Sequence, residues 1–367
     1  MRTVVVVNAR ARKGGPKAAS MIARALPHAE VVTTESADEL ERVASALVRE
    51  EPDLVLAAGG DGTAIGLINA VRAARRSAKI ALPASRRLMR MGILGLGTGN
   101  GWANVLHAPR MGVALARLRR FEDQRGRVSD LPVRRFDLLE VEGMLAHFAG
   151  TGWDAELIDD FHAQKDDVGL MSKRARAGLP GYLNALLTKS VPRNMRLPRV
   201  EIEIENKGRA PLGLDPAGRP YELPGPSSLL YRGPVGICGV ATTSQWGFGF
   251  RAFPFAGLVP GRFNLRTYIG KATEALVRTP FLWAGKHPFD QMLTWLLTAC
   301  EVRLSRKMPF QAGGDLLGHR DRVEYSIAEE RVEVLDWRGL HLAVSREPQL
   351  IEALNIGTGA MADLARG

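Results

Sequence analysis

The fold of the first third of the chain is decided by residues 53–63, DLVLAAGGDGT. The apolar run 54–58 is typical of a buried parallel strand, and the apolar spacing within 64–71 predicts a helix. The glycines therefore lie on a turn from strand to helix, where backbone N–H groups and the helix dipole favour an anion. Because glycine has no Cβ, a phosphate can come close to such a backbone. The alternative interpretation is a tight connection in which Asp61 caps the helix.

Asp61 is the acidic residue within this glycine turn. A carboxylate repels phosphate, whereas its oxygens are ligands that Mg²⁺ prefers. We therefore expect Asp61 to bind Mg²⁺, either directly or through water.

Strand and helix patterns alternate throughout residues 1–130, which predicts a parallel sheet. Ser36, followed three residues later by Glu39, predicts the start of one of its helices. Two further polar loops, 8–15 and 97–101, also follow strand patterns. Because the carboxyl ends of parallel strands meet at one edge of a sheet, we expect both loops to join the glycine turn in one ligand site.

The pattern changes near residue 131, where short alternating runs separated by glycine and proline predict mostly antiparallel strands. These runs are 136–141, 199–204, 235–241, 302–304, 322–327, 332–335 and 340–344. Helices are expected near 179–188 and 290–300. The predicted fold is an α/β N-terminal domain with a parallel sheet (1–130), a β-rich C-terminal domain for the substrate (131–367), and a cleft between them. The sequence leaves open whether the last residues pack back against the first domain.

The composition of the 367 residues favours an intracellular protein. Its two cysteines, Cys238 and Cys300, have no metal-ligand spacing and form no disulfide framework, which suits a reducing cytoplasm. The first residues read as a strand rather than a signal peptide, and no apolar run approaches the roughly 18–20 residues needed to span a bilayer. We therefore expect a cytoplasmic protein.

The net charge of +11 is unevenly distributed. Residues 62–121 and 168–200 contain no acidic residue and many arginines and lysines. Such stretches attract polyanions, although solvated basic faces are an equally good interpretation. Nucleic acid is not an expected partner, because the basic stretches lack interleaved aromatic residues and known binding motifs.

Three motifs in order along the chain carry a resemblance to a known family: Gly59–Thr63, Gly92–Asn104 with its Gly-Thr-Gly-Asn loop, and Phe148–Ala155. The chain resembles the diacylglycerol kinase catalytic-domain family, which includes bacterial lipid kinases and sphingosine and ceramide kinases. It is more distantly similar to NAD kinases and phosphofructokinases. The resemblance implies ATP-dependent phosphorylation of a lipid hydroxyl with Mg²⁺ as cofactor.

The resemblance also implies roles for individual residues, each of which has a plainer alternative as a turn residue or a solvated charge. Those expected at the phosphates are Asn8, Arg10, Lys13, Gly59, Gly60, Asp61, Gly62 and Thr63. Those expected nearer the adenosine are Thr34, Thr98, Gly99 and Asn100. Asp137 falls where bacterial lipid kinases have an acidic residue that joins a metal–water network with the equivalent of Asp61.

Two positions depart from the family pattern. The family has aspartate after the asparagine of the third loop, where this chain has Gly101, and its Asp-Gly-Glu base motif is replaced by residues 311–315, QAGGD. The position of the base is Gly313, so Asp315 is the best candidate for the catalytic base. Residues 246–266 also lack the acidic element of the family. A non-catalytic lipid- or nucleotide-binding relative is therefore an alternative to a lipid kinase, and a soluble NAD kinase is a weaker one.

A lipid substrate implies that the protein associates peripherally with a membrane. The basic stretches suit an anionic membrane surface. An apolar set could reach the acyl region, with burial in the core as the favoured alternative; it comprises Phe289, Met292, Leu293, Trp295, Leu296 and Leu297. The sequence leaves open a homodimer and the identity of the lipid.

Overall fold

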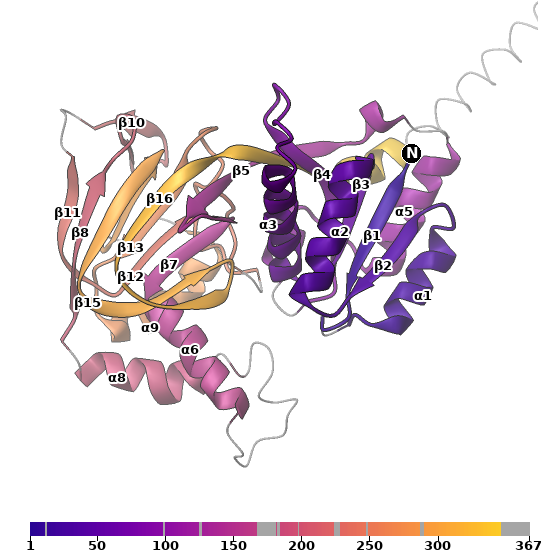
Figure 1. The fold of residues 1–367 in the computed structure, drawn as a ribbon. Coiled ribbons are helices and arrows are strands. Elements are labelled where there is room, and N and C mark those ends of the chain that lie inside the picture. The colour runs from indigo at the N-terminus through magenta and orange to yellow at the C-terminus, as the bar shows by residue number, and fades with distance from the viewer. Residues whose placement is uncertain are drawn as a thin grey trace, which may run out of the picture.

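The computed structural model describes residues 1–11, 13–97, 100–124, 127–166, 181, 184–196, 198–223, 228–246, 249–286 and 290–345. Within these residues, sixteen strands form one continuous mixed sheet (Figure 1). Its N-terminal strands are parallel and most of its C-terminal strands are antiparallel, so the predicted fold class is confirmed.

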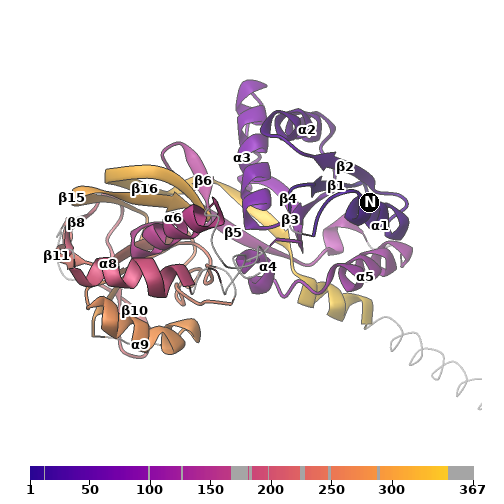
Figure 2. The same ribbon diagram turned by 90° about the horizontal axis from the view of Figure 1, so that it is seen from below.

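The N-terminal part is a parallel sheet covered by helices on both faces. Its strands are β1 (Thr3–Asn8), β2 (Glu30–Thr34), β3 (Leu54–Gly59) and β4 (Arg87–Gly95), in the order β4-β3-β1-β2. Its helices are α1 (Pro16–Ala25), α2 (Ala37–Glu50), α3 (Asp61–Ser77), α4 (Gly101–Val105) and α5 (Met111–Asp123). Figure 2 shows α2 and α3 on one face of the sheet and α1 and α5 on the other. The apolar runs of β1 and β3 are buried because the sheet is covered on both faces.

The start of α2 follows from its sequence. The hydroxyl of Ser36 accepts a hydrogen bond from the Glu39 backbone N–H at 3.2 Å. The Glu39 carboxylate accepts one from the Glu35 backbone N–H at 2.6 Å. The first bond satisfies a backbone group that the first turn of a helix leaves unpaired, and the second ties down the residue before the cap, so the predicted helix start is confirmed.

The C-terminal part is built mainly of antiparallel strands with a separate hydrophobic core. Its strands are β5 (Val133–Val141), β6 (Met144–Ala146), β7 (Phe148–Gly152), β8 (Val200–Asn206), β9 (Leu212–Leu214), β10 (Pro220–Glu222), β11 (Leu229–Val235), β12 (Ile237–Ala241), β13 (Phe263–Tyr268), β14 (Met292–Leu297), β15 (Ala299–Ala312) and β16 (Asp315–Leu335). Its helices are α6 (Trp153–Asp166), the π-helical turn η2 (Leu186–Ser190), α8 (Val191–Arg196) and α9 (Ala272–Trp283), and a 3-10 turn, η1 (Val128–Asp130), precedes β5.

Strand β16 connects the two parts. It begins in a hairpin with β15, and its last residues pair in parallel with β4, Arg331 opposite Arg87. Val332, Leu335 and the helix 337–345 that follows pack into the N-terminal core. The end of the described chain therefore completes the sheet in which the chain began.

Arg72 of α3 fixes the junction between the parts. Its guanidinium contacts the carboxylates of Glu140 on β5, at 2.6 Å, and of Glu330 on β16, at 2.7 Å. It also donates to the Gly143 carbonyl at 3.2 Å. Arg72 and Glu330 are both buried, so each charge depends on the other for its partner.

Two predicted elements are wrong. The helix expected over 290–300 is strand β14 and the start of β15. A continuous apolar run fits a buried strand as well as a helix, and β14 lies inside the sheet, paired with β13 and β9. Trp295, Leu296 and Leu297 are consequently part of the core, as the burial interpretation predicted, and Phe289 lies outside the described residues.

The strand expected over 340–344 lies in the helix 337–345. Trp337, Leu340 and Val344 are all buried, and their spacing of three and four residues places them on one helical face. The short apolar alternation within 340–344 indicated a strand because the helical spacing becomes visible only over the longer range 337–344.

Candidate active site

The glycine turn between β3 and α3 leaves backbone donors at the start of a 17-residue helix. Gly60 stands at the cap position and offers no side chain to the first N–H groups of α3. The Thr63 N–H donates to the Gly60 carbonyl at 3.0 Å, whereas those of Asp61 and Gly62 stay available to an anion. The Asn8 amide donates to the Thr63 hydroxyl at 2.8 Å, which ties the end of β1 to this turn. A Cβ on Gly59 would lie 2.2 Å from that hydroxyl, so this position requires glycine.

The third loop packs directly against the glycine turn. A Cβ on Gly97 would lie 2.4 Å from the Gly60 Cα, so the two backbones are in contact. The Leu96 N–H donates to the Gly59 carbonyl at 2.8 Å, and the Lys13 N–H donates to the Leu96 carbonyl at 3.2 Å. The structure thus brings together the three loops that follow β1, β3 and β4.

Asp61 joins this turn to the start of α4. Its two carboxylate oxygens accept hydrogen bonds from the backbone N–H groups of Gly101, at 2.7 Å, and Trp102, at 3.0 Å. Burial raises the pKa of the Asp61 carboxyl to about 6, although both hydrogen bonds oppose this rise. The backbone of Gly101 therefore contacts Asp61 where the family pattern has an aspartate side chain.

The two predicted metal ligands differ in how well they suit Mg²⁺. Asp61 lies at the loop edge, and Mg²⁺ in phosphate-transfer sites is commonly held by one or two carboxylates together with substrate phosphates. Each of its oxygens keeps a lone pair beyond the bond that it accepts. Asp137 instead pairs with Arg331 at 2.8 Å and accepts from the Gly261 N–H at 2.6 Å. The partners of Asp137 therefore belong to β16 and to residue 261 of the antiparallel part rather than to the three loops, so Asp137 is not included in the proposed site. The described residues contain no cluster of three or more ligating side chains.

The remaining predicted phosphate and adenosine residues lie on the same loops. Arg10 and Lys13 are exposed beyond β1, and the Thr34 carbonyl at the end of β2 accepts from the Ala9 N–H at 3.0 Å. The Asn100 side chain closes its own loop, since it accepts from the Gly97 N–H at 3.1 Å and donates to the Gly97 carbonyl at 3.0 Å. Thr98 and Gly99 lie outside the described residues.

Asp315 reaches the same place from the other part of the chain. It follows a tight hairpin turn in which Gly313 and Gly314 have positive φ angles, 62° and 93°. Glycine is favoured there because both central residues of such a turn are left-handed. The Asp315 carboxylate is exposed, and one oxygen lies 3.9 Å from the position of a Cβ on Gly62, in the first turn of α3.

A side-chain pair that the sequence did not reveal supports this hairpin. The Gln311 amide donates to the Asp154 carboxylate at 3.2 Å, and its carbonyl oxygen accepts from the Gly314 N–H at 3.3 Å. Both side chains are buried, and burial raises the pKa of Asp154 to about 6. The two residues belong to motifs quoted above, 148–155 and 311–315, but their sequences do not show that they meet.

His147 was also missed. Its ring stacks on Trp102 with a centroid distance of 5.1 Å, and the Gly313 N–H donates to the carbonyl of the next residue, Phe148, at 2.8 Å. His147 therefore lies between the Asp61 contacts and the Asp315 hairpin. Neither ring nitrogen has a hydrogen-bond partner among the described residues, and burial lowers the pKa of His147 to about 3, which keeps it uncharged.

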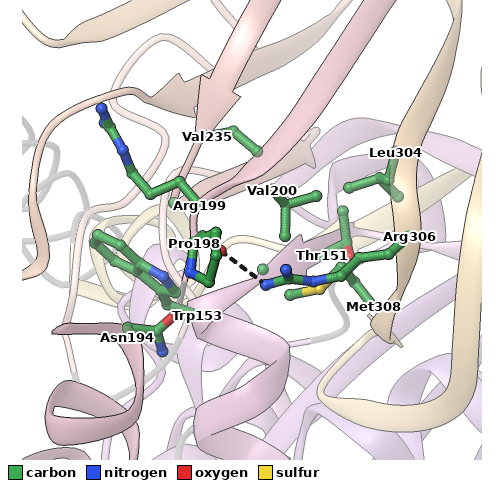
Figure 3. Close-up of a pocket in the computed structure, with 12 residues that line it drawn as sticks. Thr151, Trp153, Asn194, Pro198, Arg199, Val200, Val235, Leu304, Arg306 and Met308 are labelled. Atoms are coloured by element: carbon green, nitrogen blue, oxygen red, sulfur yellow. Dashed lines mark hydrogen bonds between the residues drawn. The ribbon is translucent and has the colours of Figure 1, made fainter. Parts of the chain in front are cut away.

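A small pocket opens at the Gly152 end of β7, which is the end away from the Asp315 hairpin (Figure 3). Thr151, Trp153 and Asn194 line it together with Arg199 and Arg306. The Arg306 guanidinium donates to the Pro198 carbonyl at 3.0 Å, as Figure 3 shows. Since Phe148 contacts the hairpin and Gly152 lines the pocket, the length of β7 separates this pocket from Asp315.

The fold and the loop edge define an α/β protein in which a glycine-capped helix start lies near a carboxylate from a second, antiparallel part. Residues 2–130 match the family model of the diacylglycerol kinase catalytic domain, which confirms the resemblance that the motifs predicted.

Solved structures from Bacillus anthracis strain Sterne share the fold over nearly their whole length. One described as a candidate diacylglycerol kinase is 15% identical, covers 90% of this chain and 96% of its own, and has a TM-score of 0.59. A second of the same description is 15% identical with a TM-score of 0.58 and the same coverage. A third, described as a diacylglycerol kinase, is 13% identical with a TM-score of 0.54, again with the same coverage. No curated protein matches the chain.

Proposed function

We propose that the protein is a kinase that transfers the γ-phosphate of ATP to the hydroxyl of a lipid. The observation that carries the proposal is the Asp315 carboxylate beside Gly62, at the start of α3. A helix start with glycine spacing suits phosphate, whereas a carboxylate in the same place suits proton transfer. A protein that only bound a nucleotide would gain nothing from a second, repelling charge at the phosphates.

The loop edge would hold the phosphates. The first N–H groups of α3 and the Thr63 hydroxyl are donors, and the exposed Arg10 and Lys13 add positive charge. Asp61 would hold Mg²⁺ brought with ATP, and that ion would neutralise charge on the phosphates. Phosphoryl transfer depends mainly on such positioning and electrostatic stabilisation.

Asp315 would act as the base. Its carboxylate takes the proton of the lipid hydroxyl as the hydroxyl oxygen bonds to the γ-phosphorus, and the bond to ADP breaks with its electrons leaving on ADP. Asp315 stands two residues after the usual base position, and the Gly313-Gly314 turn carries it toward α3. The Asp154–Gln311 pair would keep this turn in place.

A non-catalytic relative is the second candidate, and one contact favours it. The Gly101 N–H occupies an Asp61 oxygen at the position where the family pattern adds a second carboxylate. A site with one carboxylate fewer at the phosphates binds Mg²⁺ less tightly.

Transfer of labelled phosphate from ATP decides between the two candidates. The protein is incubated with Mg²⁺ and with diacylglycerol, a sphingoid base or ceramide, and the lipid extract is counted. We expect one lipid class to be labelled and Asp61→Ala to abolish the labelling. Label in no lipid while ATP still binds would establish the non-catalytic relative.

The role of Asp315 is tested in the same assay. A base in hydrogen-bond reach contributes about 10²–10⁴-fold, so Asp315→Asn is expected to lower kcat by that factor and to leave ATP affinity unchanged. Asp321→Asn is the matched control, since Asp321 is an exposed aspartate on the same strand. Equal activity of the two variants would exclude Asp315 as the base.

A further inference from the structure

Two neighbouring helices of the C-terminal part leave large apolar side chains in water. Met195 of α8 is 63% exposed, and Leu187 in the preceding turn η2 is 53% exposed. On α9, Val277 is 75% exposed and Phe281 is 53% exposed. Helices α8 and α9 pack against each other, and Figure 2 shows them side by side. Exposed apolar side chains gathered on neighbouring elements mark a binding surface.

The two α9 residues act as one patch. Val277 and Phe281 are four residues apart, so their side chains lie on the same side of the helix. Ala272 of the same helix is buried against the protein, and nine residues at 3.6 per turn place it on the opposite side of α9 from Phe281. The patch therefore faces away from the side by which α9 is attached.

Positive charge surrounds these side chains. The described residues 184–199 include no acidic residue, and Arg196 and Arg199 are exposed at the end of α8. Lys271 immediately precedes α9 and is exposed, and the acid on α9, Glu274, is half-buried. Arg193 is already neutralised by Asp160 of α6, so the net positive field comes from the exposed residues.

Apolar side chains together with exposed basic ones indicate an anionic bilayer as the partner of this surface. Helices that lie in a membrane interface combine an apolar face with lysine and arginine, and an anionic bilayer attracts each basic residue near its surface. In Figure 1, β1 runs downward from the N-terminus, so its carboxyl end, which leads into the phosphate loops, faces the lower side. Helices α8 and α9 lie at the lower end of the other part. A bilayer below the molecule would therefore meet α8 and α9 on the side toward which the loop edge is directed.

We propose that α8, α9 and the turn η2 form the surface by which the protein docks on an anionic lipid bilayer. Val277, Phe281, Met195 and Leu187 enter the interface, and Arg196, Arg199 and Lys271 contact the lipid phosphates. Delivery of substrate by this surface rests on the proposed lipid kinase function, whereas binding to the bilayer does not. No helix among the described residues is long and apolar enough to cross a membrane, so the docking is interfacial.

Sedimentation with vesicles tests the apolar half of the surface. The probe is phosphatidylcholine containing phosphatidylglycerol, compared with phosphatidylcholine alone. We expect Val277→Ser with Phe281→Ser to weaken binding to anionic vesicles about tenfold or more. The matched control is Met21→Ser with Val113→Ser, which removes two exposed apolar residues from another pair of contacting helices, α1 and α5. Loss of binding in the control alone would overturn the proposal.

Charge reversal tests the basic half independently of the apolar variants. Arg196→Glu with Lys271→Glu is expected to weaken binding to anionic vesicles at least tenfold at low salt. Arg42→Glu with Arg49→Glu on α2 changes the net charge equally at exposed positions elsewhere and is expected to have a much smaller effect. Equal loss in both pairs, or binding to neutral vesicles that salt does not weaken, would overturn the proposal.

Activity measurements separate failure of this surface from failure of the proposed kinase function. With a short-chain diacylglycerol dissolved as monomers, the α8 and α9 variants are expected to match the wild type, and only transfer to vesicle-bound lipid falls. If no lipid is phosphorylated but vesicle binding still requires α8 and α9, the docking surface stands and the kinase function fails. If lipid is phosphorylated and every variant sediments like the wild type, the docking surface is wrong.

Discussion

The two ends of the sheet differ in how their polar side chains are hydrogen-bonded. At the parallel end, Asp61 and Asn8 are each hydrogen-bonded to a neighbouring loop, and Asn100 is hydrogen-bonded within its own loop. In the antiparallel part, more of the buried side-chain polar atoms lack a partner among the described residues, although Arg75 Nε, Trp102 Nε1 and Trp337 Nε1 at the parallel end lack one as well. Those of the antiparallel part include ring nitrogens of His147 and side-chain oxygens of Asp154, Thr243, Gln245 and Asn264.

The difference affects the stability of the two parts. An unpaired buried polar group costs about 1–3 kcal/mol, so the antiparallel part, which has more such groups, gives up more stability than the parallel end. Residues that weaken a fold in this way are common at functional sites. We therefore expect the loop edge to be rigid and intolerant of change, and the antiparallel part to be more sensitive to pH.

The largest expected effect concerns Arg72, which joins the two ends. Arg72→Met leaves the buried Glu330 with only its longer contact to the exposed Arg76, and is expected to lower the free energy of unfolding in urea by about 3–5 kcal/mol. Arg76→Met is the control, since Arg76 of the same helix contacts the same carboxylate at 3.4 Å but is exposed. Its cost should stay below about 1 kcal/mol. Equal costs for the two variants would show that burial at the junction is unimportant.

Gly97→Ala tests whether the loop edge is rigid. The added Cβ would lie 2.4 Å from the Gly60 Cα, so the two backbones must separate. A displacement of this kind can cost about 10²-fold, and we expect kcat/KM for ATP to fall by that factor. Gly112→Ala in α5 meets no atom within 4 Å and should be neutral or slightly stabilising. Normal ATP kinetics in Gly97→Ala would show that the edge is compliant.

His147→Phe tests the pH sensitivity of the antiparallel part. Folded His147 stays neutral down to about pH 3, whereas the unfolded chain binds a proton near the usual pKa of 6.5, so stability is lost as pH falls through this window. Asp61 and Asp154 have the opposite effect, because burial raises their pKa to about 6 and the folded state holds extra protons below that value.

Comparing the variant with the wild type isolates the histidine contribution. Phenylalanine keeps the stacking on Trp102, so the variant should gain up to about 2 kcal/mol relative to the wild type between pH 7.5 and pH 5. Urea unfolding at both pH values measures this difference. Identical pH dependence of the two proteins would mean that His147 is protonated in the folded state.

Gln311→Met has the smallest expected effect. It removes the hydrogen bonds to Asp154 and Gly314 at nearly constant volume, so we expect kcat to fall about tenfold while ATP affinity is unchanged. Gln124→Met, at the end of α5, controls for the loss of an amide. A fall in ATP affinity as large as the fall in kcat would assign Gln311 to general stability rather than to the position of Asp315.

The parallel end was the more predictable of the two, for a physical reason. Its order is local: β3, the glycine turn and α3 are contiguous, and glycines at 59 and 60 are needed by contacts within a few residues or in one adjacent loop. The capping residue Ser36 likewise acts on its own helix. Such features leave a sequence pattern, and that pattern located the three loops.

The antiparallel part depends on contacts between distant residues. Asp154 meets Gln311, and Asp315 meets Gly62, across separations that no spacing encodes. The sequence predicts a helix at β14 because its mainly apolar run, Met292–Leu297, shows no period of two. The pairing of Asp137 with Arg331 could not be foreseen either, because it depends on the register between β5 and β16.

Strand β16 makes two earlier strands, β4 and β5, dependent on a much later part of the sequence. Its last residues, Arg331–Leu335, lie between β4 and β5, so both of those strands obtain a neighbour from more than 180 residues further along the chain. A fragment ending at residue 130 would leave β4 as a bare sheet edge, and bare edges promote aggregation. The segment that matches the kinase family therefore needs β16 to complete its sheet. During synthesis, β4 and β5 therefore wait for a strand that is made more than 180 residues later.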